Sequence, residues 1–131
     1  MARKFERYLP KFACQASDAI TADAISGGTT TQFDTASTGN ADGCEEAEIE
    51  IDVTVAPSTK ARCEIYMQPL EHDGTGNSAN KLMGGIAIET TADKYTVKID
   101  RLSEKGNIVL KAIDYGFTAS ASFKGQYPAD A

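Results

Sequence analysis

The chain has one histidine, His72, which lies in a polar loop beside Asp73 and a few residues before Ser78. A histidine activates a serine nucleophile only when a third group orients it and all three side chains converge in space. The sequence has no Gly-x-Ser-x-Gly turn to present such a serine. We therefore expect His72 to be a solvent-facing loop residue, and the sequence predicts no catalytic residues.

The same loop offers oxygen ligands for Ca²⁺ in Asp73, Asn77 and Asn80. It lacks the ligand spacing and the terminal glutamate of an EF-hand loop. Residues 74–81 have the glycine content of a phosphate-binding loop but not its Gly-Lys-Ser/Thr ending. The sequence therefore predicts neither a bound metal nor a cofactor.

Three cysteines, Cys14, Cys44 and Cys63, are too far apart in the chain to form a Cys-x-x-Cys zinc or redox motif. Three cysteines also cannot all pair within one chain. We expect reduced thiols in a protein made in a cytosol. Because a free cysteine behaves as a small apolar residue, Cys63 is expected to be buried on its strand.

The overall charge excludes some partners. Thirteen basic residues stand against 19 acidic ones in 131 residues, which gives a net charge of −6. Affinity for nucleic acid comes from lysines and arginines that neutralise phosphates, so we expect no nucleic-acid binding. The chain has no run of about 18 apolar residues and no apolar stretch typical of a signal peptide near its first residue. We expect no membrane partner.

Residues 1–12 form a basic, aromatic N-terminal arm, and residues 13–131 are expected to form one domain. Four basic residues in the arm stand against Glu6, a net charge of +3 that leaves −9 on the domain. Two interpretations lead: the arm packs on its own domain, or it reaches an acidic neighbouring subunit; nucleic-acid binding by the arm is a minor third. In the second case we expect the contacts to come from Arg3, Lys4, Phe5, Arg7, Tyr8 and Phe12.

An acidic segment follows, because residues 34–52 contain seven carboxylates and no lysine or arginine. Such a segment is typical of a solvated strand face. Alternatively, Glu45, Glu46, Glu48 and Glu50 form a surface that meets the basic arm of another copy. The acidic side chains would also oppose edge-to-edge pairing if this strand lay at the edge of a sheet.

Apolar residues recur at every second position from Ile49 to Val55, and acidic residues occupy most of the positions between them. This period indicates a strand with one buried face. Seven such strands are expected, at residues 29–33, 48–55, 62–68, 82–90, 95–102, 107–113 and 117–126. With no amphipathic helix pattern, the sequence predicts an all-β protein: an antiparallel β-sandwich with Ig-like or jelly-roll-like connections. Gly84-Gly85 indicates a bulge or a close backbone approach.

The order of these features resembles the capsid decoration (cement) proteins of tailed bacteriophages. The resemblance covers about residues 29–131. It rests on a Ser/Thr/Ala/Gly-rich lead (19–38), the strand Ile-Glu-Ile-Asp-Val-Thr-Val-Ala-Pro (49–57), Asp73-Gly74, and the closing segments 114–120 and 125–131. It implies a β-rich structural virion protein that is assembled in the host cytoplasm. The protein would bind the major capsid protein on the outer capsid surface as a homo-oligomer, most often a trimer.

Two alternatives remain at this stage. One is a structural protein of the phage tail or neck. The other is a glycan-binding β-sandwich module, for which Tyr66, Tyr95 and Tyr115 would have to supply the aromatic platform because the chain has no tryptophan.

Overall fold

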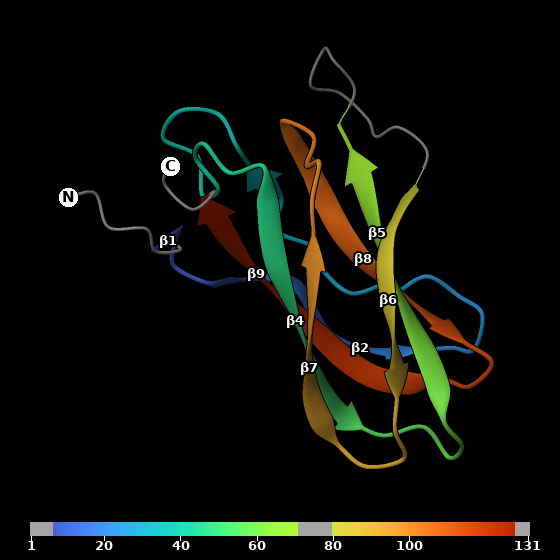
Figure 1. The fold of residues 1–131 in the computed structure, drawn as a ribbon. Helices are drawn as coiled ribbons and strands as arrows, with labels where there is room; N and C mark the ends of the chain where they lie inside the picture. Colours follow the sequence, from blue (N-terminus) through green and yellow to red (C-terminus); the bar gives the residue numbers. More distant parts are fainter. Residues whose placement is uncertain (1–6, 71–79, 128–131) are drawn as a thin grey trace.

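The structure is a computed structural model that describes residues 7–70 and 80–127. The described residues form strands and no helix (Figure 1), so none of them belongs to a helix able to span a membrane. The strands are β1 (Arg7–Tyr8), β2 (Phe12–Ile20), β3 (Phe33–Asp34), β4 (Glu46–Val55), β5 (Ala61–Pro69), β6 (Lys81–Ile88), β7 (Asp93–Ile99), β8 (Lys105–Ile113) and β9 (Phe117–Tyr127).

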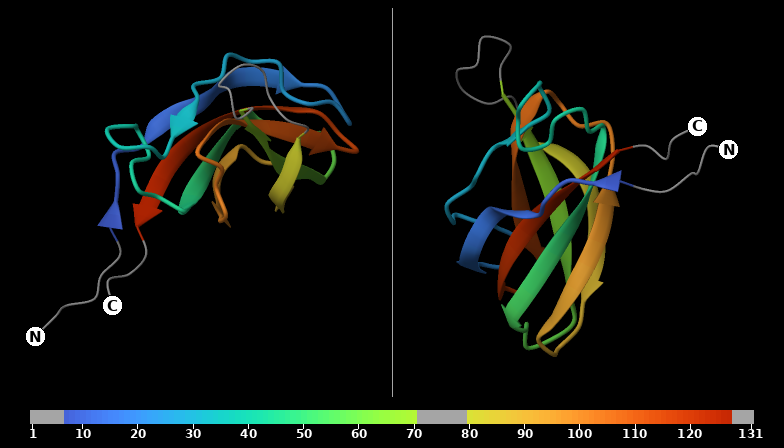
Figure 2. Two further views of the ribbon diagram at one scale, coloured as in Figure 1. Left: turned by 90° about the horizontal axis from the view of Figure 1, so that it is seen from above. Right: turned by 90° about the vertical axis from the view of Figure 1, so that its left-hand side faces the viewer.

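The strands form two antiparallel sheets. In the first sheet, called sheet A here, the order is β1-β9-β4-β7, and β2 pairs with β9 on the same side as β1. In the second, sheet B, the order is β3-β8-β5-β6. The sheets face each other across one core (Figure 2). The prediction of an all-β antiparallel sandwich is confirmed; seven of its strands are long, and β1 and β3 have two residues each.

The core follows from the period-two pattern of the long strands. In β4, Ile49, Ile51 and Val53 point inward and are fully buried, while the acidic residues between them lie on the outer face. Strand β4 lies between β9 and β7, in the interior of sheet A. Its carboxylates therefore do not protect a sheet edge, and the idea that they would do so is wrong for this strand.

Three phenylalanine rings join the two sheets. Phe123 of β9 is fully buried and stacks on Phe33 of β3, with ring centroids 5.2 Å apart. Phe123 also stacks on Phe12 of β2, again with ring centroids 5.2 Å apart. The stack packs the first residue of β2 and a short strand of sheet B against the central strand of sheet A.

The region 13–43 differs most from the prediction. Only one strand is predicted there, at residues 29–33, but the region contains nearly all of the long strand β2, and the later strand is reduced to Phe33–Asp34. Two register shifts, on either side of Gln15, interrupt the pairing of β2 with β9. Because each bulge reverses the inward and outward positions, β2 shows no clean period of two in the sequence.

Candidate interaction surface

Part of the basic arm packs on its own domain. Strand β1 pairs with the end of β9, with Arg7 opposite Tyr127 and Tyr8 opposite Gln126. The backbone amide of Leu9 then donates to the carbonyl of Gly125 at 2.9 Å. Arg3, Lys4 and Phe5 lie outside the described residues. In the single chain, residues 7–12 therefore follow the first of the two interpretations, a segment packed on its own domain.

The arm contacts the acidic strand of the same chain. The hydroxyl of Tyr8 donates to Oε1 of Glu48 at 3.1 Å, and Nζ of Lys11 lies 3.2 Å from Oε1 of Glu50. Nζ of Lys124 lies 4.3 Å above the centre of the Tyr8 ring, in cation–π geometry. Charge complementarity between arm and acidic segment is thus partly satisfied without a second copy.

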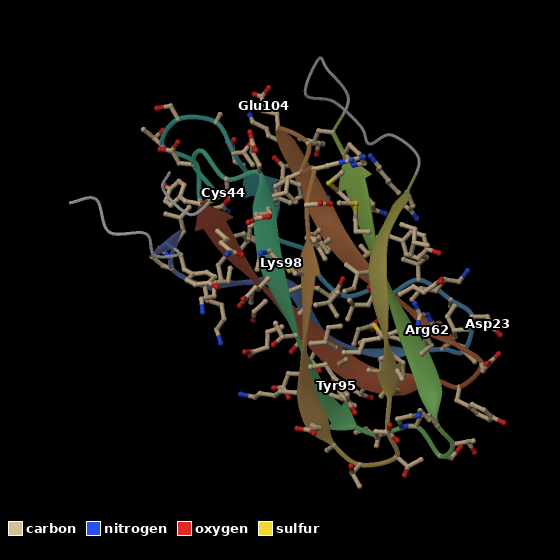
Figure 3. The ribbon with its side chains drawn as sticks, in the orientation of Figure 1. Asp23, Cys44, Arg62, Tyr95, Lys98 and Glu104 are labelled. Carbon is tan, nitrogen blue, oxygen red and sulfur yellow. The ribbon has the colours of Figure 1, made fainter. Side chains whose placement is uncertain are left out.

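Lysines flank the acidic residues of β4 on both sides. Glu48 faces Lys124 of β9 on one side and Lys98 of β7 on the other, and Asp52 faces Lys94. Lys98 is labelled in Figure 3, and its Nζ lies 3.5 Å from Oε1 of Glu46. We call this surface of sheet A the charged face, and it consists of Glu46, Glu48, Glu50, Asp52, Lys11, Lys94, Lys98 and Lys124. Its four carboxylates and four lysines balance, so it is not a net acidic surface.

One hollow on the charged face has a volume of about 150 Å³. That hollow is lined by Lys11, Glu48, Glu50, Thr96 and Lys124. The remaining acidic candidate, Glu45, is exposed just before β4 and lines a separate hollow of about 480 Å³ with Asp100 and Arg101. Within the described residues, no three His, Cys, Asp or Glu side chains gather as a metal site would require.

Removing the Lys11 amine tests how strongly the charged face holds the arm. Both partners of the Lys11–Glu50 pair are partly exposed. We therefore expect Lys11→Ala to lower the free energy of unfolding by no more than about 0.5 kcal/mol, because water and salt screen exposed pairs. Urea denaturation measures the change. Lys60→Ala is the matched control, since Lys60 forms an exposed pair with Glu89 away from the arm. A loss above about 1.5 kcal/mol for Lys11→Ala alone would contradict this expectation.

The tyrosines proposed for a glycan platform lie on different elements. Tyr66 is on the outer face of sheet B and donates to Oε1 of Glu64 at 2.8 Å, and this bond to a carboxylate raises the pKa of Tyr66. Tyr95 points inward from β7 and accepts a bond from the amide of Glu89 at 3.0 Å. Tyr115 lies between β8 and β9 and is 42% exposed. The three rings therefore do not form one platform.

The remaining candidates are the cysteines and the polar loop. All three cysteines are free and buried, so the prediction for Cys63 is confirmed. Burial raises the pKa of Cys14 and of Cys63 to about 12, and it also raises the pKa of Cys44. His72, Asp73, Asn77 and Ser78 lie outside the described residues, whereas Asn80 is exposed just before β6. The predictions for that loop stay predictions.

The fold and this surface define a β-sandwich protein with a strand-forming N-terminal segment. The sequence matches no protein-family model and no curated protein. Among solved structures it is similar to a chain from the work titled "Bacillus endospore appendages form a novel family of disulfide-linked pili", with a TM-score of 0.38 and 9% identity over 98% of this chain and 93% of that chain. A likeness at this TM-score carries no inference about function.

Proposed function

We propose that this chain is a structural virion protein of a tailed bacteriophage, a decoration protein that binds the major capsid protein on the outer capsid surface. The observation that carries the proposal is the pairing of β1 with the end of β9. Because Arg7 lies opposite Tyr127, the first and last described residues of the chain lie side by side where β1 meets the end of β9 (Figure 2). Arg3, Lys4 and Phe5 come shortly before β1 in the sequence.

The mechanism is burial of surface across the joints between capsid subunits. A stable interface of this kind buries at least about 1,000 Å² in total, which a sandwich face together with an arm can supply. The basic segment 1–6 binds an acidic surface of a neighbouring subunit, and opposite potentials set its orientation. When each copy binds the next through two different surfaces, the contacts close into a ring if the rotation between copies is a whole fraction of a turn, and the ring we propose is a trimer.

The buried cysteines support assembly in the host cytoplasm. Cys14, Cys44 and Cys63 fill core positions as thiols, and none of them forms a disulfide. A small β-sandwich that needs no disulfide folds in a reducing compartment, where virions of this class are built.

A charge reversal in the arm tests the proposed function. Full-length protein with Arg3→Glu and Lys4→Glu is mixed with shells of the major capsid protein from the same virus, and bound protein is measured by co-sedimentation. We expect at least about tenfold weaker binding than for the unaltered chain, because two attractive contacts become repulsive. Lys60→Glu is the control: it reverses one charge in the connection between β4 and β5, half the charge change of the arm variant, and should bind normally.

Three results would overturn the proposal. The unaltered chain could fail to bind the shells, it could bind tail or neck assemblies in their place, or the arm variant could bind as well as the control. Native mass spectrometry of the free protein tests the trimer separately. The genes beside the one that encodes this chain give an independent check, since a neighbouring major capsid gene is expected.

A further inference from the structure

The two sheets expose free strand edges on the same side of the sandwich. Sheet A ends at β7 and sheet B ends at β6, and these two strands are neighbours at that side of the sandwich (Figures 1 and 2). A Cβ built on Gly84 of β6 would lie 3.2 Å from Cγ1 of Val97 of β7. None of the described residues forms a ladder with the outer edge of either strand. A free edge of this kind leaves unpaired N–H and C=O groups in a row.

Two other edges of the sandwich are partly covered. The amide of Ala16 donates to the carbonyl of Thr29, and the amide of Thr31 donates to the carbonyl of Cys14, so residues 29–31 protect the outer edge of β2. Bridges from Ala22 and Ile25 protect part of β8 in the same way. Among the described residues no such bridge covers the outer edge of β6 or β7, and we call the side that they form the open side.

Apolar side chains line this open side. Met83 and Ile86 of β6 and Tyr95 and Val97 of β7 pack against the core but stay partly accessible. Leu82 is 53% exposed beside them. At one end the strands border a hollow of about 350 Å³, lined by Lys81, Leu82, Met83, Asp100 and Arg101. An added strand would cover these side chains.

The charges of β7 indicate which strand would fit. Lys94, Thr96 and Lys98 point outward and are exposed. Along its other edge β7 pairs with β4, which places Glu48 opposite Lys98 and Asp52 opposite Lys94. The same lysines flank the free edge, and no carboxylate among the described residues forms an ion pair with Lys94.

We propose that the free edge of β7 binds an extended segment of a partner protein in which acidic residues alternate with apolar ones. The segment adds one strand to sheet A by backbone hydrogen bonding. Two of its acidic residues, four positions apart, face Lys94 and Lys98 on the outer side. The apolar residues between them cover Tyr95 and Val97 on the inner side. This site does not depend on the proposed virion function.

Two other occupants fit less well. A second copy that paired β7 with β7 around a twofold axis at Thr96 would place Lys94 opposite Lys98 of the other copy, and like charges in direct opposition destabilise a strand pair. The arm of a second copy carries a net charge of +3 and would meet the same lysines with positive side chains.

The test uses the full-length protein and a synthetic peptide with the sequence of residues 46–55, because that segment pairs with β7 inside the chain. Binding is followed by NMR titration of the backbone amides. We expect shifts in residues 93–99, with protection of their outer amides from hydrogen exchange, and no shifts in β9. A control peptide carries lysine at the positions of Glu46, Glu48, Glu50 and Asp52 and should bind about tenfold more weakly.

Variants of the protein complete the test. Lys94→Glu with Lys98→Glu should reverse the preference between the two peptides. Lys124→Glu makes the same charge change on the charged face but lies on β9, beyond β4, and should leave the preference unchanged. The proposal is overturned by an absence of shifts in β7, by shifts in β9 that indicate exchange with β4, by an equal response to both peptides, or by self-association through β7.

Discussion

Replacing Phe123 by alanine is expected to lower the free energy of unfolding by about 3–5 kcal/mol. Phe123 is fully buried, stacks on Phe12 and Phe33, and lies opposite Ile49 in the register of β9 and β4. The change removes a ring whose neighbours come from three other strands, so no single movement refills the cavity. Urea denaturation followed by circular dichroism measures the loss. A domain of this size is stabilised by about 5–15 kcal/mol, so the loss is a large share of the total.

Two further variants keep this experiment informative. Phe123→Leu retains most of the apolar volume and should cost less than the alanine change, so it still reports on the site if Phe123→Ala does not fold. Tyr115→Ala removes an exposed ring from the connection between β8 and β9, and should change stability by no more than about 0.5 kcal/mol. Equal losses for Phe123→Ala and Tyr115→Ala would contradict the central place of the phenylalanine stack.

The strands that could be predicted are those with largely uninterrupted alternation. Strands β4 and β5 alternate between inward and outward positions over most of their length, β9 does so up to Lys124 and β8 does so apart from the buried Val109; the ends of all four lie within two residues of the expected ranges. Strand β2 could not be found this way, because its bulges shift the pattern twice within nine residues. The order of the strands in each sheet depends on pairings between distant parts of the chain, such as β1 with β9, which no local pattern encodes.

The candidate surface was predictable in its residue types but not in its partners. The sequence indicates that a basic arm and an acidic strand are complementary, and the contacts of Tyr8 with Glu48 and of Lys11 with Glu50 agree with that chemistry. Whether such contacts form within one chain depends on where β1 joins the sheet. The sequence shows that Lys94 and Lys98 lie on the same face of one strand. That these lysines flank a free sheet edge follows only from the position of β7 at the end of sheet A.

High pH is expected to destabilise the fold through the buried thiols. Cys14 and Cys63 are fully buried, and burial raises the pKa of each to about 12, whereas a thiol in the unfolded chain has a pKa near 8.5–9. As the pH rises above about 9, the unfolded chain loses these protons while the folded chain keeps them. The unfolded state then binds fewer protons, so stability is complete below that pH and falls as the pH approaches about 12.

The expected loss between about pH 9 and pH 10.5 is about 2 kcal/mol per buried thiol. Lysines and tyrosines titrate in the same range, so the measurement compares the unaltered chain with Cys14→Ala and with Cys63→Ala by urea denaturation at each pH. Each variant pays a packing cost that does not change with pH, but its stability should fall less steeply because one titrating thiol is gone. Parallel pH curves for all three chains would show that the thiol protons are not linked to folding.

The rate of thiol modification tests the same burial in a second way. Near neutral pH, a thiol reagent should modify Cys14 and Cys63 only as fast as the folded chain opens.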